Sequence, residues 1–330
     1  MNSIFAQDVL AGLAASPKRL LSKYFYDERG NRLFQAIMQL DEYYLTRSEY
    51  EILAEHKVAL LALFQPKVTA CEGHQGQDEI NNNCFELIEF GAGDGLKIKL
   101  LLKYFLEQHA QFKYIPIDIS ADAVNGLVAD LRTVFPDLEI EGVQNDYFRA
   151  LDYLKSRSKV RKIALFLGAN IGNFSDAEAI QFLSGLRKNL HPDDLLMIGF
   201  DLKKDPHQIL AAYNDASGVT RDFNLNLLQR INNELGGDFE LPHFKHYPTY
   251  DPVSGEARSY LMSTCEQTVH LSKLNTSFRF TAWEPIHLEI SRKYDLPTIT
   301  RLAEQSGYEV VQHFFDSNHF FVDTVLRPLS

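Results

Sequence analysis

The chain has 330 residues, 45% of them hydrophobic, which is enough apolar material for one large domain or two. Its formal net charge of −11 argues against a nucleic-acid partner, because such a partner requires a basic surface. The sequence lacks an apolar run of the roughly 18–20 residues that cross a bilayer. It also lacks a basic segment followed by an apolar one at its start, so we expect a cytoplasmic protein with no membrane partner.

The first 60 residues are predicted to be helical, with two tyrosine-rich breaks. The predicted helices are Asp8–Ala15, Asn31–Leu40 and Ser48–Phe64. The breaks, Lys23–Asp27 and Asp41–Arg47, each contain two tyrosines. Tyrosines in such loops are commonly half-buried rings whose hydroxyls reach water. The pattern alone therefore leaves open whether they bind a ligand.

Residues 66–85 are polar and weakly periodic, which predicts an exposed loop or insertion. Cys71, His74 and Cys84 lie in or beside it at irregular spacing, and the chain has no C-x-x-C pair. Structural zinc takes four ligands, so we expect neither a metal site nor a disulfide.

The stretch Leu87–Leu102 has the pattern of a buried strand, a glycine turn and the start of a helix. Three glycines form the turn: Gly91, Gly93 and Gly95. They allow positive φ and let a ligand approach the backbone, next to the free N–H groups of the helix. The spacing is not the dinucleotide fingerprint, because Leu96 stands where its third glycine would be. With Glu89 before the turn, the stretch favours S-adenosylmethionine (SAM), with NAD and a turn without ligand as alternatives.

From Phe85 onward, short apolar strands alternate with helices. The predicted strands are Phe85–Phe90, Phe112–Ile119, Leu138–Val143, Lys162–Leu167 and Asp194–Phe200. One helix is predicted to begin after the glycine turn and to end at His109. Further helices are predicted over Ala121–Phe135, Tyr147–Lys155 and Asp176–Leu190. This alternation predicts an α/β fold with a parallel, doubly wound sheet whose ligands bind at the strand carboxyl ends.

Polar residues follow three successive strands of this predicted sheet. Asp118 ends the second strand, where a carboxylate can accept from both ribose hydroxyls. Asp146 follows the third and could accept from an adenine amino group, and Asn173 follows the fourth, where the methyl group would face its acceptor. Each could also be an ordinary cap or turn residue.

After residue 200 the alternation ends. Helices are predicted at Pro206–Ser217 and Arg221–Leu235, and strands at Phe244–Tyr250 and Ala257–Thr268. The chain closes with a helix at Leu296–Ser306 and two strands, Tyr308–Phe315 and His319–Leu326. A final antiparallel hairpin after five parallel strands is typical of class I methyltransferases. Before the last helix, Glu289 and Ser291 share one face of an extended segment, which on pattern alone is more often a solvated polar face.

Several longer motifs resemble the L-histidine Nα-methyltransferases of the ergothioneine pathway. They are Tyr24–Asp27, Asp41–Glu49, Glu89–Gly93, Gly168–Asn173, Ala211–Thr220 and Glu289–Lys293. The resemblance covers Leu20 to Pro328 except the 70–84 loop. It implies a Rossmann-like class I methyltransferase domain with a mostly parallel sheet closed by an antiparallel hairpin, and a second α+β domain for substrate. We expect the SAM-binding domain at 61–200 and 286–330, and the substrate domain at 1–60 and 201–285, in a monomer.

The resemblance also implies roles for particular residues. The cofactor residues would be Gly91, Lys97, Asp118, Asp146 and Tyr147. The substrate residues would be Tyr26, Tyr43, Asn173, Tyr213, Glu289 and Ser291, with Tyr26, Tyr43 and Asn173 at the reacting amine. Glu289 and Ser291 would bond the imidazole of histidine, and Tyr260 would stand where relatives have a methionine.

These residue types suit transfer of a methyl group from a sulfonium to an amine. The reaction needs a neutral amine held close to the methyl carbon and correctly aimed, which an amide and phenols can achieve. Tyrosine faces can tolerate the growing ammonium of a trimethylated product. The alternatives are another amino-acid-derived amine, such as an indole amino acid, a non-catalytic cofactor-binding module, and an NAD-dependent oxidoreductase. An indole would not need the carboxylate of Glu289.

Overall fold

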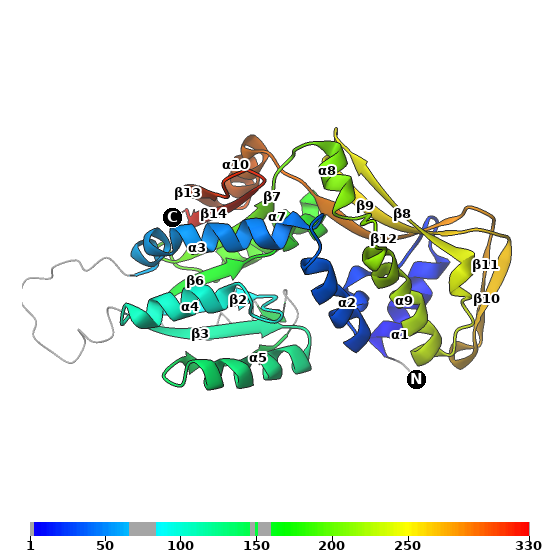
Figure 1. Cartoon of the computed structure of the whole chain (residues 1–330), viewed down its shortest axis with the longest axis horizontal. Coiled ribbons are helices and arrows are strands. Elements are labelled where there is room, and N and C mark those ends of the chain that lie inside the picture. The colour runs from blue at the N-terminus through cyan, green and yellow to red at the C-terminus, as the bar shows by residue number, and fades with distance from the viewer. Residues whose placement is uncertain (1–2, 66–83, 146–148, 151–159, 330) are drawn as a thin grey trace, which may run out of the picture. The chain divides into compact units, whose positions relative to one another are not determined.

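The computed structural model describes residues 3–65, 84–145, 149–150 and 160–329 (Figure 1). The chain divides into two compact units. The first unit comprises Met1–Tyr44 and Lys203–Lys293, and the second comprises Leu45–Leu202 and Tyr294–Ser330. Among the described residues, no helix combines the length and the apolar character needed to cross a membrane.

The second unit is built on one mostly parallel sheet in the strand order β13-β14-β7-β6-β2-β3-β4, with β5 also paired to β3. Its strands are β2 (Cys84–Phe90), β3 (Gln111–Asp118), β4 (Glu139–Ile140), β5 (Val143–Gln144), β6 (Arg161–Phe166), β7 (Leu195–Asp201), β13 (Tyr308–Phe315) and β14 (Phe321–Pro328). The neighbouring strands β4, β3, β2, β6 and β7 pair in parallel. By contrast, β14 runs antiparallel to both β7 and β13. The predicted class I methyltransferase sheet with its closing hairpin is confirmed.

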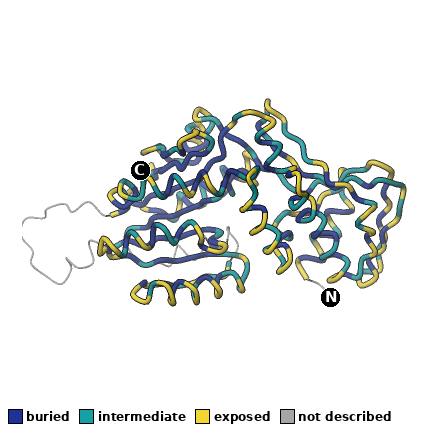
Figure 2. Tube along the Cα trace, viewed as in Figure 1, coloured by how far each residue is buried: buried dark blue, intermediate teal, exposed yellow. Residues whose placement is uncertain are grey.

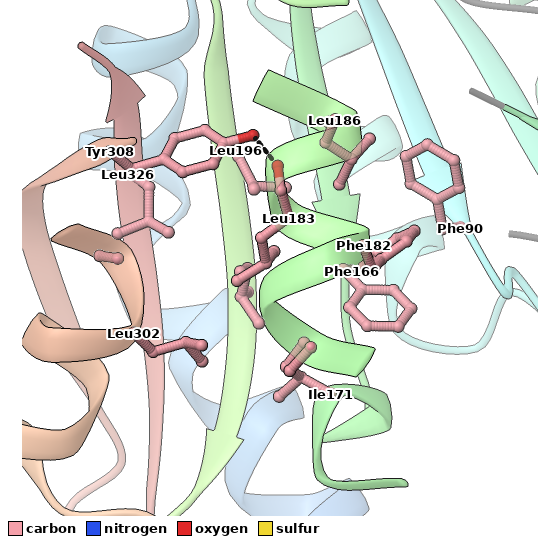
Figure 3. Close-up of a cluster of buried hydrophobic side chains, with 14 of the residues drawn as sticks. Phe90, Phe166, Ile171, Phe182, Leu183, Leu186, Leu196, Leu302, Tyr308 and Leu326 are labelled. Atoms are coloured by element: carbon pink, nitrogen blue, oxygen red, sulfur yellow. Dashed lines mark hydrogen bonds between the residues drawn. The ribbon is translucent and has the colours of Figure 1, made fainter. Parts of the chain in front are cut away.

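Helices and side chains cover this sheet and bury its strands. The helices are α3 (Tyr44–Phe64), α4 (Ile98–Glu107), α5 (Ala121–Val134), α7 (Asp176–Arg187) and α10 (Leu296–Gln305). The central strands are buried along most of their length (Figure 2), which is why their sequences are almost continuously apolar. Phe90, Phe166 and Phe182 form part of the core shown in Figure 3, where the Tyr308 hydroxyl donates to the Leu183 carbonyl at 3.0 Å.

The first unit packs helices against a small mixed sheet in the order β1-β12-β9-β8, with a separate hairpin of β10 and β11. Its strands are β1 (Lys18–Arg19), β8 (Phe244–Asp251), β9 (Glu256–Ser263), β10 (Gln267–Leu271), β11 (Thr276–Phe280) and β12 (Pro285–Arg292). Its helices are α1 (Ile4–Ala14), α2 (Glu28–Met38), α8 (Pro206–Ala211) and α9 (Val219–Leu235). Apolar side chains of α1, α9 and the strands form one buried core, including Val9, Leu227 and Leu261.

Three secondary-structure predictions were wrong in part. The single strand expected at Ala257–Thr268 is two strands, β9 and β10, because the Ser263 hydroxyl bonds to the Cys265 carbonyl and the chain turns there. The helix expected at Pro206–Ser217 ends at Ala211, since the following residues lead into Asp215, whose carboxylate caps the start of α9. The third strand of the sheet is split into β4 and β5. The predicted helix Tyr147–Lys155 lies largely outside the described residues.

The compact units differ from the expected domain ranges at residues 45–60, 201–202 and 286–293. Residues 45–60 belong to the second unit, where α3 ends in Phe64, whose ring packs edge-on to Phe85 of β2 and Phe105 of α4. Residues 286–293 belong to the first unit, because β12 pairs along its length with β9.

Candidate active site

The glycine turn of the second unit leaves an open approach to the backbone. Gly91, Gly93 and Gly95 have φ of 75°, 55° and 69°, which favours glycine at each position. The Gly91 N–H donates to the Ile117 carbonyl at 2.7 Å and so fixes the turn to β3. A Cβ built on Gly93 would meet no heavy atom within 4 Å, whereas one on Gly95 would lie 2.3 Å from Leu127. Gly93 is thus the point at which a ligand can approach closely, as SAM would require.

Asp118, at the end of β3, joins this turn. Its Oδ2 accepts the Gly93 N–H at 3.2 Å and its Oδ1 accepts the Ser120 N–H at 3.0 Å. A carboxylate has about four acceptor sites, so Asp118 keeps capacity for ribose hydroxyls. The arrangement fits the expected cofactor role and also explains how the acid is aimed.

Lys97 forms an ion pair with Glu49, a residue for which no role was predicted. Its Nζ pairs with Glu49 of α3, which is fully buried. The same carboxylate accepts the Gly168 N–H, at 2.7 Å to Oε1 and 3.0 Å to Oε2. Burial alone would lower the pKa of Lys97, but the charge and hydrogen bond of Glu49 raise it above its ordinary value. Glu49 therefore joins the helix that follows the glycine turn to the loop that follows β6.

Asp323 of β14 completes this buried cluster. Burial, and next the charge of Glu49, raise the pKa of Asp323 well above its usual range. Both carboxyl oxygens of Asp323 are buried, and neither has a hydrogen-bond partner among the described residues, so no donor favours the ionised form of this group. With Asp323 protonated, Glu49, Lys97 and Asp323 together carry no net charge, which lowers the cost of burying the two carboxyl groups.

The remaining predicted residues of the second unit are placed only in part. Asn173 ends the short 3-10 helix Asn170–Asn173 after β6, and its side chain is exposed. That helix follows a tight turn in which Gly168 and Ala169 both have positive φ. Asp146 and Tyr147 lie outside the described residues, as do Cys71 and His74.

Tyr26 and Tyr43 meet in one aromatic cluster of the first unit. The Tyr26 ring lies edge-on to Phe34 at 5.6 Å and to Phe223 at 5.7 Å between centroids. The Phe34 ring lies edge-on to Tyr43 at 6.2 Å. The two tyrosines come from different loops, and Phe34 of α2 with Phe223 of α9 fixes their positions. Neither phenylalanine was predicted to be a site residue.

Glu289, Ser291 and Tyr213 also gather in the first unit, on β12 and just after α8. Glu289 and Ser291 pair with Ser259 and Ala257 of β9, which are buried, so both point to the interior face of the sheet. The Tyr213 hydroxyl donates to the Ser291 Oγ at 2.7 Å. The predicted solvated polar face is therefore an interior face.

Burial raises the pKa of Glu289 to about 7, while the positive charge of Lys293 acts in the opposite direction. Lys293 is 1% exposed, and its Nζ donates to the hydroxyls of both Tyr213 and Ser291. This lysine is the last residue of the motif Glu289–Lys293, but its contact with Tyr213 could not be inferred from spacing.

Tyr260, which would stand where relatives have a methionine, lies on a different face of the sheet from Glu289 and Ser291. Tyr260 lines a surface pocket with Arg258, His287 and Ile290. Ile290 lies between Glu289 and Ser291 on one strand, so its side chain points to the opposite face of the sheet. Tyr260 therefore does not share the face that carries Glu289 and Ser291.

Two alanine substitutions test the different roles of Gly95, which packs against Leu127, and Gly93, which lies where a ligand can approach the backbone. We expect Gly95→Ala to destabilise the protein, because its Cβ would collide with Leu127. Gly93→Ala meets open space, so it should cost only about 1–2 kcal/mol of backbone strain while weakening cofactor binding. Urea unfolding and titration with S-adenosylhomocysteine measure the two effects. The account is contradicted if Gly93→Ala binds the cofactor product as the wild type does.

The chain matches a known family over nearly its whole length. The family described as "Histidine-specific methyltransferase, SAM-dependent" matches residues 5–328. The chain is 34% identical to the histidine N-alpha-methyltransferase of Mycolicibacterium smegmatis, covering 91% of this chain and 88% of that protein. It is 30% identical to ergothioneine biosynthesis protein 1 of Neurospora crassa, over 92% of this chain but 32% of that protein.

A more distant relative acts on a different kind of acceptor according to its name. The 4-dimethylallyltryptophan N-methyltransferase of Claviceps fusiformis is 24% identical over 91% of this chain and 85% of that protein. The match to the family profile and the identity to the mycobacterial enzyme decide the assignment. The chain belongs to the family of histidine-specific, SAM-dependent methyltransferases.

Proposed function

We propose that this enzyme transfers methyl groups from SAM to the α-amino nitrogen of L-histidine and yields the trimethylated betaine hercynine, the first step of ergothioneine biosynthesis. The names of the relatives with the higher identities support the histidine acceptor and the pathway. The observation that carries the proposal is Glu289, a carboxyl on an interior face beside Ser291. A neutral imidazole has both an N–H donor and a nitrogen acceptor, which Glu289 and Ser291 can bind, whereas an indole has only an N–H donor.

Each unit supplies part of the proposed residue set. In the second unit, Gly91, Gly93 and Asp118 would hold the cofactor, and SAM would supply the electrophilic methyl group. Gly93 leaves room for the cofactor against the backbone, and Asp118 is aimed by two N–H donors. Asp146 and Tyr147 remain proposed cofactor residues from the motif alone.

Lys97 has a proposed role that its contacts modify. Because Glu49 already neutralises it, Lys97 would act toward the cofactor as one member of a neutral cluster and not as an isolated positive charge. Hydrogen-bond donation from its ammonium remains available to a carboxylate, since an ammonium has three donors.

The acceptor residues would hold the substrate so that its amine is aimed at the methyl group. Asn173 and the hydroxyls of Tyr26 and Tyr43 would hold the amino and carboxylate groups of histidine. The rings of the aromatic cluster around Phe34 offer faces to the ammonium as methyl groups are added, each worth about 0.5–2 kcal/mol. Tyr213, Glu289 and Ser291 would bind the imidazole side.

Calorimetric titration tests this proposal without relying on turnover. We expect S-adenosylhomocysteine to bind, and L-histidine to bind to that complex, whereas leucine, which lacks the polar ring, should bind at least roughly 10³-fold more weakly. Tryptophan tests the alternative acceptor suggested by the Claviceps relative. Binding of the cofactor product without binding of any amino acid would contradict the proposal and favour a non-catalytic module.

A further inference from the structure

Lys293 occupies an unusual position for a lysine, because its buried Nζ is one corner of a closed triangle of hydrogen bonds. Its Nζ lies 2.6 Å from the Tyr213 hydroxyl and 2.8 Å from the Ser291 Oγ, and these two hydroxyls are 2.7 Å apart. The ammonium also lies 4.7 Å from the centre of the Tyr213 ring. A buried ammonium is costly, so its place beside two proposed substrate residues requires an explanation.

The lysine fixes the direction of the hydrogen bonds around it. An ammonium can only donate, so both hydroxyl oxygens accept from Lys293. The Tyr213 phenol is a stronger acid than an alcohol, and it donates to Ser291. The two lone pairs of the Ser291 oxygen are then filled by Lys293 and Tyr213. Its hydrogen cannot bond to either of these two donors, so toward a substrate Ser291 can only donate.

Glu289 supplies a hydrogen-bond acceptor on the same face of the sheet as the donor Ser291. It precedes Ser291 by two residues, and the two pair with adjacent interior positions of β9, Ser259 and Ala257. An ionised carboxylate only accepts. Burial raises the pKa of Glu289 to about 7 and the charge of Lys293 opposes that rise, so the ionised, accepting form is the major one above pH 7. The face thus presents one acceptor and one donor, with Glu289 and Lys293 balancing each other's charge.

Neighbouring groups do not change this balance at neutral pH. His246 of β8 contacts Ser259 at 2.9 Å, and Ser259 donates to Asn224 of α9 at 2.7 Å. Burial lowers the pKa of His246 to about 4, so this imidazole is neutral. Lys293 and Tyr213 also border Ser291, and His287 contacts the Glu289 backbone, where burial lowers the pKa of the His287 imidazole.

A neutral imidazole has one N–H and one unprotonated nitrogen, whereas an imidazolium has two N–H groups. We propose that Lys293 is a positioning residue that makes this face specific for the neutral ring, with the ring N–H on Glu289 and the unprotonated nitrogen facing the Ser291 hydroxyl. The proposal rests on the function proposed above, in which histidine is the acceptor. An imidazolium would place a second donor against the donor of Ser291.

The test compares L-histidine with 2-fluoro-L-histidine as substrates between pH 5 and pH 8. Fluorine keeps the ring neutral throughout this range. Both substrates carry an α-amino group, and both meet the same Glu289, so the ratio of their kcat/KM values largely isolates the protonation of the histidine ring. We expect the kcat/KM for histidine, divided by the kcat/KM for 2-fluorohistidine, to fall about tenfold for each pH unit below the pKa of the free histidine ring, about 6.5.

The variant Lys293→Met removes the ammonium and frees a lone pair on Ser291. We expect its kcat/KM for histidine at pH 8 to fall roughly 10- to 100-fold, and the ratio of the two substrates to lose its dependence on pH. Ser291→Ala should flatten the ratio as well and serves if Lys293→Met does not fold. Lys273→Met, at an exposed lysine of the same unit, is the matched control and should keep the wild-type profile.

The outcomes separate this inference from the proposed function. Methylation of neither substrate by a protein that binds S-adenosylhomocysteine would overturn both. Methylation of both substrates with a ratio that does not change with pH in the wild type, or that changes equally in Lys293→Met, would overturn the role of Lys293 while histidine methylation stands.

Discussion

Glu289→Ala should abolish most histidine turnover and leave cofactor binding intact. Removing one side of a charge-assisted hydrogen bond in a largely buried site costs about 2–5 kcal/mol. If the loss appears in kcat/KM for histidine, it amounts to roughly 30- to 5,000-fold. The reason is that the imidazole N–H would lose its acceptor. Glu289 lies in the first unit, whereas the glycine turn and Asp118 lie in the second.

Steady-state kinetics with histidine and calorimetry with S-adenosylhomocysteine measure the two parts of this prediction. The matched control is Glu266→Ala, since Glu266 is an exposed acid of the same unit that pairs with Arg279. An exposed pair contributes little, so the control should behave like the wild type. Unchanged histidine kinetics in Glu289→Ala would show that the imidazole does not bind at this carboxylate.

Glu49→Ala should be among the most destabilising single substitutions in the second unit. It leaves Lys97 without its carboxylate and removes the acceptor of the Gly168 N–H. Breaking a buried ion pair by removing one partner costs about 3–5 kcal/mol. We expect a loss of that size in the free energy of unfolding, measured by urea denaturation monitored by circular dichroism. Glu55→Ala, at an exposed position of the same helix, should stay within about 0.5 kcal/mol of the wild type.

The neighbouring Asp323→Asn tests the protonation within that cluster. A protonated carboxyl is uncharged, so an uncharged amide of nearly the same size can replace it without adding or removing a charge. The cost should therefore stay near 1 kcal/mol. A loss as large as that of Glu49→Ala would mean that Asp323 is ionised and that the cluster carries a net negative charge.

Local patterns were sufficient to predict the sheet and the glycine turn. Strands such as β2 and β6 are short, apolar and bounded by polar residues, so their alternation with helices was visible. The boundary between β9 and β10 was not visible, because the break depends on the Ser263 hydroxyl and on backbone pairing of Ser263 with Glu284. No propensity distinguishes a strand that continues from one that passes into another sheet.

Among the candidate site residues, those placed by local features could be predicted, whereas those placed by tertiary contacts could not. The place of Asp118 at the end of a strand could be predicted, because a strand end and a turn are local features. The partner of Lys97 could not, since Glu49 lies on a helix 48 residues earlier and takes part through tertiary packing. Lys293 ends the motif Glu289–Lys293, but its contact with Tyr213, which is 80 residues away, could not be predicted. Residues that act by orienting others are found only when the contacts are known.

The most direct test of the account is mass spectrometry of the products formed from all twenty amino acids. Purified enzyme is incubated with SAM carrying deuterated methyl groups, and each amino acid is examined for added methyl groups. The account predicts that histidine gains up to three, and that fragmentation places them on the α-nitrogen and none on the ring. Methylation of tryptophan in place of histidine, or label on the imidazole, would contradict the account.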